Sequence, residues 1–86
     1  MTYRIEIGRN ARKELLSLPA SGQRRVERAI DALARNPRPR GVKQLVASGG
    51  ALRLRVGDYR VIYEVRDDVL LVLVLKVAPR KDAYRR

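Results

Sequence analysis

Arg53-Leu-Arg-Val-Gly-Asp-Tyr-Arg-Val-Ile-Tyr63 is the stretch that decides the fold, because two alternating segments flank a short turn. Apolar side chains alternate with arginines on both sides of the turn, and a period of two is typical of strands that bury one face. The central Gly57 and Asp58 form a glycine-first pair that suits a two-residue hairpin turn. The stretch therefore predicts an antiparallel hairpin in which Arg55 lies directly opposite Arg60.

The same register predicts that three arginines share one face of this hairpin. On the other face Leu54 would pair with Val61, where helices can cover both side chains. Like charges directly opposite each other destabilise a sheet, so an anion bound between them would relieve the repulsion. The arginine cluster, formed by Arg53, Arg55 and Arg60, therefore indicates a phosphate-binding site. A structural alternative is that these arginines only discourage aggregation through a sheet edge.

The N-terminal half predicts one strand followed by two helices. Residues 3–7 alternate between apolar and charged side chains, as a half-buried strand does. Asn10 is a plausible cap for a first helix, which Pro19 would end. Ser21 is a plausible cap for a second amphipathic helix, which would end near residues 36 and 37 because the position before a proline resists helical geometry. The two helices together predict a helical hairpin that packs on one face of the sheet.

The C-terminal half predicts two further strands. Residues 42–46 are compatible with a short strand, and the nearly unbroken apolar run at residues 69–77 predicts a central strand covered on both faces. A tight turn at residues 67 and 68 would pair Arg66 with Val69, and the same register pairs Ile62 with Leu73.

This register also places an apolar strip on the arginine face. The strip is formed by Leu71, Leu73 and Leu75. An uncovered apolar patch is typical of a partner-binding site. A C-terminal segment that folds back over the strip is an equally economical interpretation.

Length and composition limit the possible functions. The 86 residues are expected to form a single domain, residues 1–86, and arginine accounts for 16 of the 20 basic residues in a formal net charge of +11. The sequence contains no cysteine and no histidine, which excludes disulfides, thiolate metal sites and histidine acid–base chemistry. We expect no metal or cofactor. No segment predicts a membrane span, so a cytoplasmic protein is expected.

Beyond the hairpin, the acidic turn, the apolar strand and the Arg80-Lys-Asp-Ala-Tyr84 tail complete a pattern that resembles the RelE branch of the RelE/ParE toxin family. The resemblance extends over nearly the whole chain. It implies an α+β fold in which a two-helix hairpin packs on one face of an antiparallel sheet of four or five strands, in the order β-α-α-β-β-β. It also implies a toxin of a type II toxin–antitoxin system that a cognate RelB-like antitoxin holds inactive.

The released toxin, by this resemblance, is a metal-independent endoribonuclease that cleaves mRNA in the ribosomal A site. The ribose 2′-hydroxyl attacks the adjacent phosphate and leaves a 2′,3′-cyclic phosphate end. Carried over by position, Arg60 matches the arginine that stabilises the transition state and Arg80 the one that assists the leaving group. Tyr84 matches a tail aromatic that orients the RNA. Arg53 and Arg55 occupy basic strand positions where better-known members carry lysines. Operator DNA would be reached only through the antitoxin.

The sequence does not identify the general base of this reaction. It also leaves two other functions open. Arginine has an unperturbed pKa of about 12.5 or more, so Arg53 or Arg55 is a poor proton acceptor. Glu64 could serve if it pointed toward Arg53, although a structural ion pair is the commoner role for such a glutamate. The alternatives are a ParE-like toxin that poisons DNA gyrase and a non-catalytic basic module that binds nucleic acid.

Overall fold

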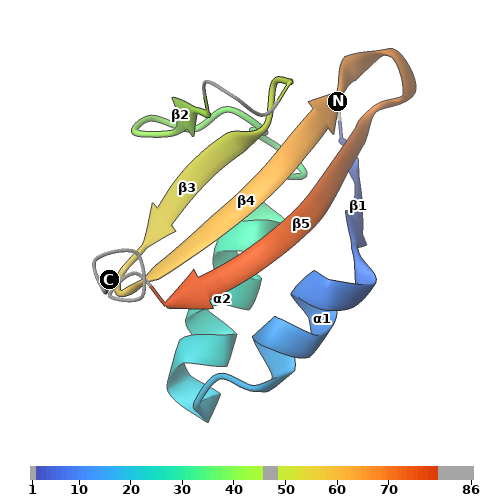
Figure 1. The fold of residues 1–86 in the computed structure, drawn as a ribbon. Helices are drawn as coiled ribbons and strands as arrows, with labels where there is room; N and C mark the ends of the chain where they lie inside the picture. Colours follow the sequence, from blue (N-terminus) through green and yellow to red (C-terminus); the bar gives the residue numbers. More distant parts are fainter. Residues whose placement is uncertain (1, 46–48, 80–86) are drawn as a thin grey trace.

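The computed structural model describes residues 2–45 and 49–79, which form two helices and a five-stranded sheet (Figure 1). The elements in chain order are β1 (Arg4–Ile7), α1 (Arg9–Leu16), α2 (Ala20–Ala32), β2 (Lys43–Gln44), β3 (Leu52–Val56), β4 (Tyr59–Arg66), the 3-10 turn η1 (Asp67–Val69) and β5 (Leu71–Pro79). The strand order across the sheet is β1-β5-β4-β3-β2. The predicted α+β fold, with two helices on a sheet, is confirmed. None of the helices in these residues is long and apolar enough to cross a membrane.

One strand departs from the predicted antiparallel sheet, because β1 pairs with β5 in parallel. Arg4 lies opposite Leu71 and Ile7 opposite Val74. The sheet is therefore mixed. An alternating sequence shows which side chains share a face, but the alternation is the same for parallel and antiparallel strands, so the direction of this pairing was not readable from residues 3–7.

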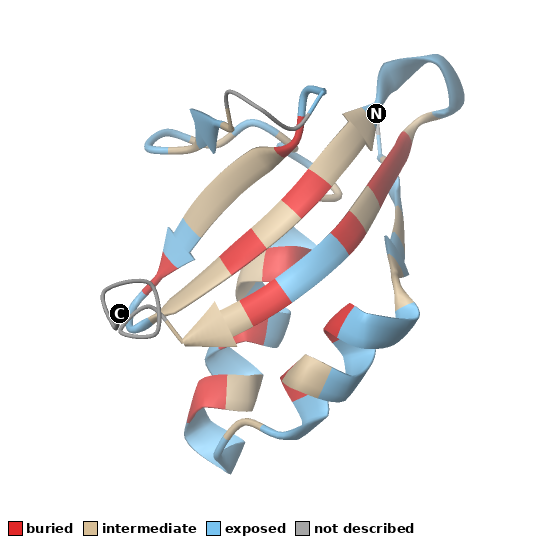
Figure 2. Cartoon of the chain, in the orientation of Figure 1, coloured by how far each residue is buried: buried red, intermediate tan, exposed pale blue. Residues whose placement is uncertain are grey.

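The core lies between the two helices and one face of the sheet. Buried positions alternate along β4 and β5, as Figure 2 shows. Tyr63 is completely buried in this core, and its hydroxyl donates a 2.7 Å hydrogen bond to the carbonyl oxygen of Pro37. The main buried side chains are Leu15, Val26, Ile30, Leu33, Val61, Tyr63, Val72, Val74 and Val77. Among the described residues no helix lies on the opposite face of the sheet, which we call the open face.

Both helices begin two residues earlier than predicted. Gly8 precedes α1 and Pro19 precedes α2, each with an extended backbone, and neither helix start has a side-chain cap. Asn10 and Ser21 therefore lie inside the first turns. The second helix also ends earlier, at Ala32. Just beyond it, the carbonyl of Ala34 accepts a 2.7 Å hydrogen bond from the backbone N–H of Tyr3, the residue before β1.

The predicted register between β4 and β5 is wrong. Arg66 lies opposite Leu71, and Ile62 lies opposite Lys76. Two features cause the shift: residues 67–70 form a longer turn than predicted, with Leu70 at φ 52°, and a β-bulge interrupts the pairing next to Ile62. The longer turn shifts the pairing by two residues and keeps Leu71 and Leu73 on the open face. The bulge shifts it by one more and brings Val77 into the core.

The strand β5 is central, as predicted, but the predicted cover on both faces is not provided by the described residues. The helices lie on one face only, and Leu75 is 37% exposed. Leu73 is half-buried and lies outside the helix-side core. The apolar strip therefore belongs to the open face, but Leu71 is buried at 9% exposure, so Leu73 and Leu75 are its accessible part.

Candidate phosphate-binding site

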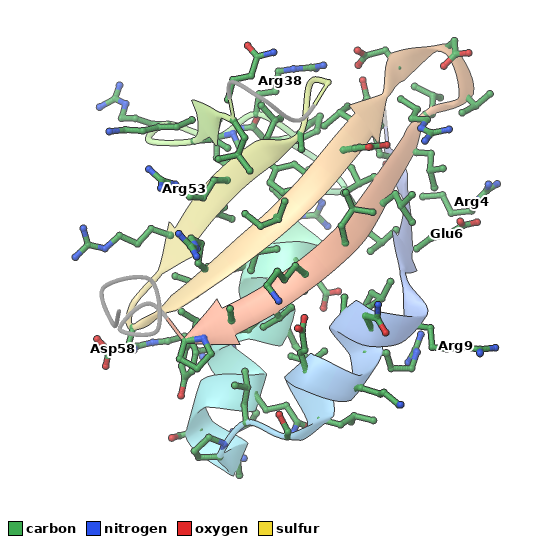
Figure 3. All side chains as sticks on the ribbon, in the orientation of Figure 1. Arg4, Glu6, Arg9, Arg38, Arg53 and Asp58 are labelled. Carbon is green, nitrogen blue, oxygen red and sulfur yellow. The ribbon has the colours of Figure 1, made fainter. Side chains whose placement is uncertain are left out.

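The β3–β4 hairpin has the register predicted from its two-residue turn. Arg55 lies directly opposite Arg60, and Arg53 lies opposite Ile62. Leu54 and Val61 pair with each other and belong to the helix-side core or pack against it. Because side chains alternate along a strand, the three neighbouring arginines lie together on the open face. Figure 3 shows Arg53 extending from β3 into free space. The hairpin thus positions the arginine cluster with two guanidinium groups on directly opposed residues.

Arg60 carries an unused donor. Its Nε is inaccessible to solvent and has no hydrogen-bond partner among the described residues. Buried polar groups are nearly always hydrogen-bonded, so this Nε is a donor that the described residues leave without an acceptor. A phosphate oxygen is the acceptor that suits a guanidinium best, because both groups can form charge-assisted, paired hydrogen bonds.

A fourth cation joins the cluster, and the sequence analysis missed it. Lys43 on β2 lies directly opposite Arg53, so the open face carries a second pair of opposed like charges. Neither Lys43 nor any arginine of the cluster forms an ion pair within residues 2–45 and 49–79. The strand β2 is only two residues long, which is too short for an alternating pattern to reveal which side Lys43 faces.

The acidic residues of the open face lie away from the cluster. Glu64 forms a 2.8 Å ion pair with Arg66, and Glu6 forms a 3.3 Å ion pair with Arg4. Glu64 therefore has the structural ion-pair role and does not contact Arg53. The far end of the open face therefore carries paired charges, whereas Arg53, Arg55 and Arg60 near the hairpin turn form no ion pair within the described residues.

Glu14 on α1 fastens the end of β5 beyond the last residue that pairs with β1. Its carboxylate accepts hydrogen bonds from the Lys76 ammonium at 2.9 Å and from the backbone N–H of Val77 at 2.8 Å. Burial raises the pKa of Glu14, but the hydrogen bonds from Lys76 and Val77 outweigh this effect and leave the pKa below its usual value. The helix layer and the strand end are thereby held together beside the hairpin.

Asp67 fastens the opposite end of the sheet. It accepts two hydrogen bonds from Arg38, at 2.9 and 3.2 Å, and one of 2.6 Å from the Tyr3 hydroxyl. The hydrogen bonds from Arg38 and Tyr3 lower the pKa of Asp67. This contact joins the residue before β1, the loop after α2 and η1. It gives Arg38 a structural role, in contrast to the arginines of the hairpin, which form no ion pair within the described residues.

Two predicted site residues, Arg80 and Tyr84, lie outside the described residues. Within the part of the chain that the structure describes, no group of three or more acidic side chains is arranged to hold a metal ion. The site is therefore represented here by the arginine cluster and Lys43.

Comparison with known proteins identifies the fold and the family. Residues 5–84 match the family described as the ParE toxin of the type II toxin–antitoxin system parDE. Putative toxin RelE1 of Methanocaldococcus jannaschii is 32% identical over 88 residues, covering 99% of this chain and 98% of the relative. Toxin RelG of Mycobacterium tuberculosis is 33% identical over 87 residues and covers both chains completely.

Solved structures give the same result. The archaeal RelE–RelB complex from Pyrococcus horikoshii OT3 contains a chain that superimposes with a TM-score of 0.81 at 40% identity, covering 93% of this chain and 97% of that one. The toxin–antitoxin complex RelBE2 of Mycobacterium tuberculosis matches with a TM-score of 0.80 at 30% identity, covering 93% of this chain and 100% of that one. Together with the basic hairpin, these likenesses show that the chain belongs to the RelE/ParE family of type II toxin–antitoxin toxins, on its RelE-like branch.

Proposed function

We propose that this toxin is a ribosome-dependent endoribonuclease that cleaves mRNA in the A site. The observation that carries the proposal is the direct opposition of Arg55 and Arg60 on the open face, with the Arg60 Nε left unpartnered among the described residues. Two opposed guanidinium groups can hold one phosphate between them. Their repulsion in the free protein is relieved when the phosphate binds, and more fully as negative charge builds up during the reaction.

The proposed reaction begins with attack of the ribose 2′-hydroxyl on the adjacent phosphorus. A bond forms from the 2′-oxygen to phosphorus while the bond to the 5′-oxygen breaks, which yields a 2′,3′-cyclic phosphate and a 5′-hydroxyl end. Arg60 and Arg55 stabilise the charge on the phosphorane oxygens. Arg53 and Lys43 bind the phosphates next to the scissile one, because their place beside the pair continues the basic surface along β2 and β3.

The remaining roles follow from the family resemblance. Arg80 stabilises the departing 5′-oxygen, which takes a proton from water to become the 5′-hydroxyl, and Tyr84 stacks on the RNA. The chain has no histidine, and Glu64 is engaged with Arg66, so a water molecule or a ribosomal group takes the proton of the 2′-hydroxyl. The ribosome is needed on this account both to position the RNA and to complete the acid–base chemistry. We further propose that residues 1–86 act as one domain in the cytoplasm, where ribosomes and mRNA are present.

A RelB-like antitoxin is the proposed inhibitor. The solved relatives from Pyrococcus horikoshii and Mycobacterium tuberculosis are toxin–antitoxin complexes. On this chain, an antitoxin segment with an apolar stripe and acidic residues would lie on the apolar strip and neutralise the arginine cluster, because both are on the open face. The toxin would reach operator DNA only through this antitoxin.

The test uses ribosomes that hold a start codon in the P site and a defined codon in the A site. Primer extension after addition of the full chain should show cleavage within the A-site codon, and the downstream fragment should carry a 5′-hydroxyl that polynucleotide kinase can label. Replacement of the A-site riboses by 2′-deoxyribose removes the nucleophile and should abolish the cut. The same mRNA without ribosomes should be cut poorly.

A negative result would have a specific meaning. The matched family is named for ParE, so a gyrase supercoiling assay should accompany the ribosome assay. Intact mRNA together with inhibited gyrase would replace the ribonuclease proposal with the ParE-like one. Cleavage that persists on the 2′-deoxy substrate would contradict the proposed chemistry.

A further inference from the structure

The end of β5 has no paired strand on its β1 side. β1 runs parallel to β5 only as far as Ile7, which lies opposite Val74. The backbone N–H of Gly8 then donates a 2.8 Å hydrogen bond to the Val74 carbonyl, and the chain turns into α1. Residues 76–79 of β5 therefore pair with β4 alone.

This same segment of β5 lies beside Arg60. Ala78 is directly opposite Arg60, and Arg80 is the first residue after β5 in the sequence. The bulge next to Ile62 interrupts the ladder immediately before the segment, so the regular pairing of the far end of the sheet does not continue into it. The backbone neighbour of Arg60 is therefore a strand end that is unpaired on one edge and follows an irregularity.

Glu14 takes the place of the missing strand. Its carboxylate accepts a 2.8 Å hydrogen bond from the backbone N–H of Val77, and a 2.9 Å hydrogen bond from the Lys76 ammonium. Glu14 is carried by α1, where the side chains of Ala11 and Leu15 are buried in the core and fix the helix. An edge donor of the sheet is thus satisfied by a carboxylate that is anchored in the helix layer.

Open space adjoins this contact. A cleft of about 560 Å³ lies between the end of α1 and the end of β5, and its lining includes Glu14, Leu18, Val77 and Pro79. A close-packed interface would resist displacement by packing alone, whereas a cleft of this size leaves room for the strand end to shift. Glu14 bonds to the strand backbone at the wall of this cleft and so limits the shift.

We propose that Glu14 is a positioning residue for the cleavage reaction, because its hydrogen bond from the Val77 N–H holds the end of β5, and with it Arg60, in the place that the transition state requires. This inference rests on the proposed function. Glu14 belongs to α1, on the helix side of the sheet, so it acts through the strand and not by contact with RNA on the open face. A purely structural Glu14 would stabilise the fold without changing the rate of the folded toxin.

The test separates the reach of the Glu14 side chain from its charge. Glu14→Gln keeps the length and one oxygen acceptor for the Val77 N–H, but removes the charge that pairs with Lys76. Glu14→Asp keeps the charge but is one methylene shorter, which withdraws the carboxylate from a fixed backbone donor, while the flexible Lys76 side chain can follow it. Glu6→Gln and Glu6→Asp are the matched controls, because Glu6 also forms an ion pair, with Arg4.

The first readout is cleavage under single-turnover conditions on programmed ribosomes, measured over a range of toxin concentrations. Glu14→Asp should lower the maximal rate about tenfold and change the half-saturating concentration by less than about twofold, because a displaced donor costs more in the transition state than in binding. Glu14→Gln and both Glu6 variants should stay within about twofold of the unmodified toxin, because Arg60 keeps its place. Equal losses in Glu14→Gln and Glu14→Asp would assign the effect to charge and overturn the proposal.

The second readout needs no cleavage. NMR of the nitrogen-15-labelled toxin follows hydrogen exchange at Arg60 Nε, which is inaccessible to solvent in the structure. Glu14→Asp should speed this exchange about tenfold, because the strand beside Arg60 opens more often, and Glu14→Gln should not. Faster exchange in a toxin that never cleaves mRNA would retain Glu14 as the anchor of Arg60 and reject the nuclease. Unchanged exchange and rate in folded Glu14→Asp would overturn the positioning role alone.

A backbone variant keeps the test decisive if circular dichroism shows that Glu14→Asp does not fold. An ester in place of the peptide bond between Lys76 and Val77 removes the N–H that Glu14 accepts and leaves every side chain unchanged. The ester-containing toxin should show the same loss of maximal rate and the same faster exchange at Arg60 Nε. An ester-containing toxin that matches the unmodified one in both would overturn the proposal.

Discussion

Gly22 of α2 lies directly against the ring of Tyr59, the first residue of β4. A Cβ atom at position 22 would collide with the Tyr59 hydroxyl and with ring carbons within 2.8 Å. The absence of a side chain at Gly22 therefore lets the helix approach the hairpin just after its turn. Because Arg60 follows Tyr59 in the chain, this contact also helps to fix the position of the Arg55–Arg60 pair.

Gly22→Ala should destabilise the protein and weaken the toxin. Relieving the overlap must displace the Tyr59 ring or separate α2 from the hairpin, and overpacking of this kind typically costs about 1–3 kcal/mol. The higher helix propensity of alanine offsets up to about 1 kcal/mol of this. Chemical denaturation measures the free energy of unfolding, and Ser21→Ala, at the exposed neighbouring position, is the control. A Gly22→Ala protein as stable as the control would contradict the close packing.

Arg60→Ala should remove most of the toxicity. Loss of one preorganised donor to a developing oxyanion typically costs about 3 kcal/mol, or roughly a hundredfold in rate. We expect the same order of loss for Arg80→Ala. Cleavage rate on programmed ribosomes and growth arrest after induction give the two readouts. Arg12→Ala, at an exposed position of α1, is the control and should leave both unchanged. Full growth arrest by a folded Arg60→Ala/Arg80→Ala double variant would remove these arginines from the mechanism.

The sequence predicted the hairpin register because a two-residue turn allows only one pairing, and Gly57 marks that turn. The next turn gave no such signal. Leu70 adopts a left-handed backbone at φ 52°, a conformation usually marked by glycine or asparagine, and the bulge beside Ile62 has no glycine either. The pairing of Arg66 with Leu71 therefore had to come from the structure.

The candidate site was likewise only partly predictable from the sequence. The arginine cluster follows from alternation along two well-marked strands, so its common face was predictable. Lys43 was not, because β2 is only two residues long. The contact between α2 and the β3–β4 turn was not predictable for a different reason: the two segments are about thirty residues apart, and the periodicity of either segment alone does not place them together.

Glu14→Gln should reduce stability at neutral pH and lose that disadvantage in acid. The pKa of Glu14 is lowered in the folded protein, so its carboxylate stabilises the fold above the unfolded pKa of about 4.3, and the contribution disappears as the pH falls through the lower folded value. For a partly exposed ion pair the difference at pH 7 should be about 0.2–1 kcal/mol. Denaturation series at pH 7 and pH 3 measure it. A constant difference at both pH values would show that the charge of Glu14 has no role.

Tyr63→Phe should change the stability of the protein in alkali. Burial raises the pKa of Tyr63 to about 12, above the unfolded value of about 10. The unfolded chain therefore releases this proton first, and the stability that depends on the neutral phenol is present below pH 10 and is lost as the pH rises toward 12. The variant lacks this component and should lose less stability over that interval. It should also be about 1 kcal/mol less stable at pH 8, because the hydrogen bond to Pro37 is removed. Parallel alkaline losses in both proteins would contradict the assignment.

Leu73→Asp should weaken antitoxin binding, whereas Arg28→Glu on α2 should not. The open face joins the apolar strip to the arginine cluster, so an acidic amphipathic segment docked there would cover both, and a new carboxylate at Leu73 would oppose it by charge and by reduced apolar packing. Leu75→Asp is a useful second variant because Leu75 is already 37% exposed and its replacement should disturb folding less. Surface plasmon resonance with the cognate antitoxin measures both rates, and added salt should slow association more than it speeds dissociation, because peripheral charges act mainly on the association rate. If only Arg28→Glu loses binding, the antitoxin grips the helices, and inhibition must then proceed without covering the arginine cluster.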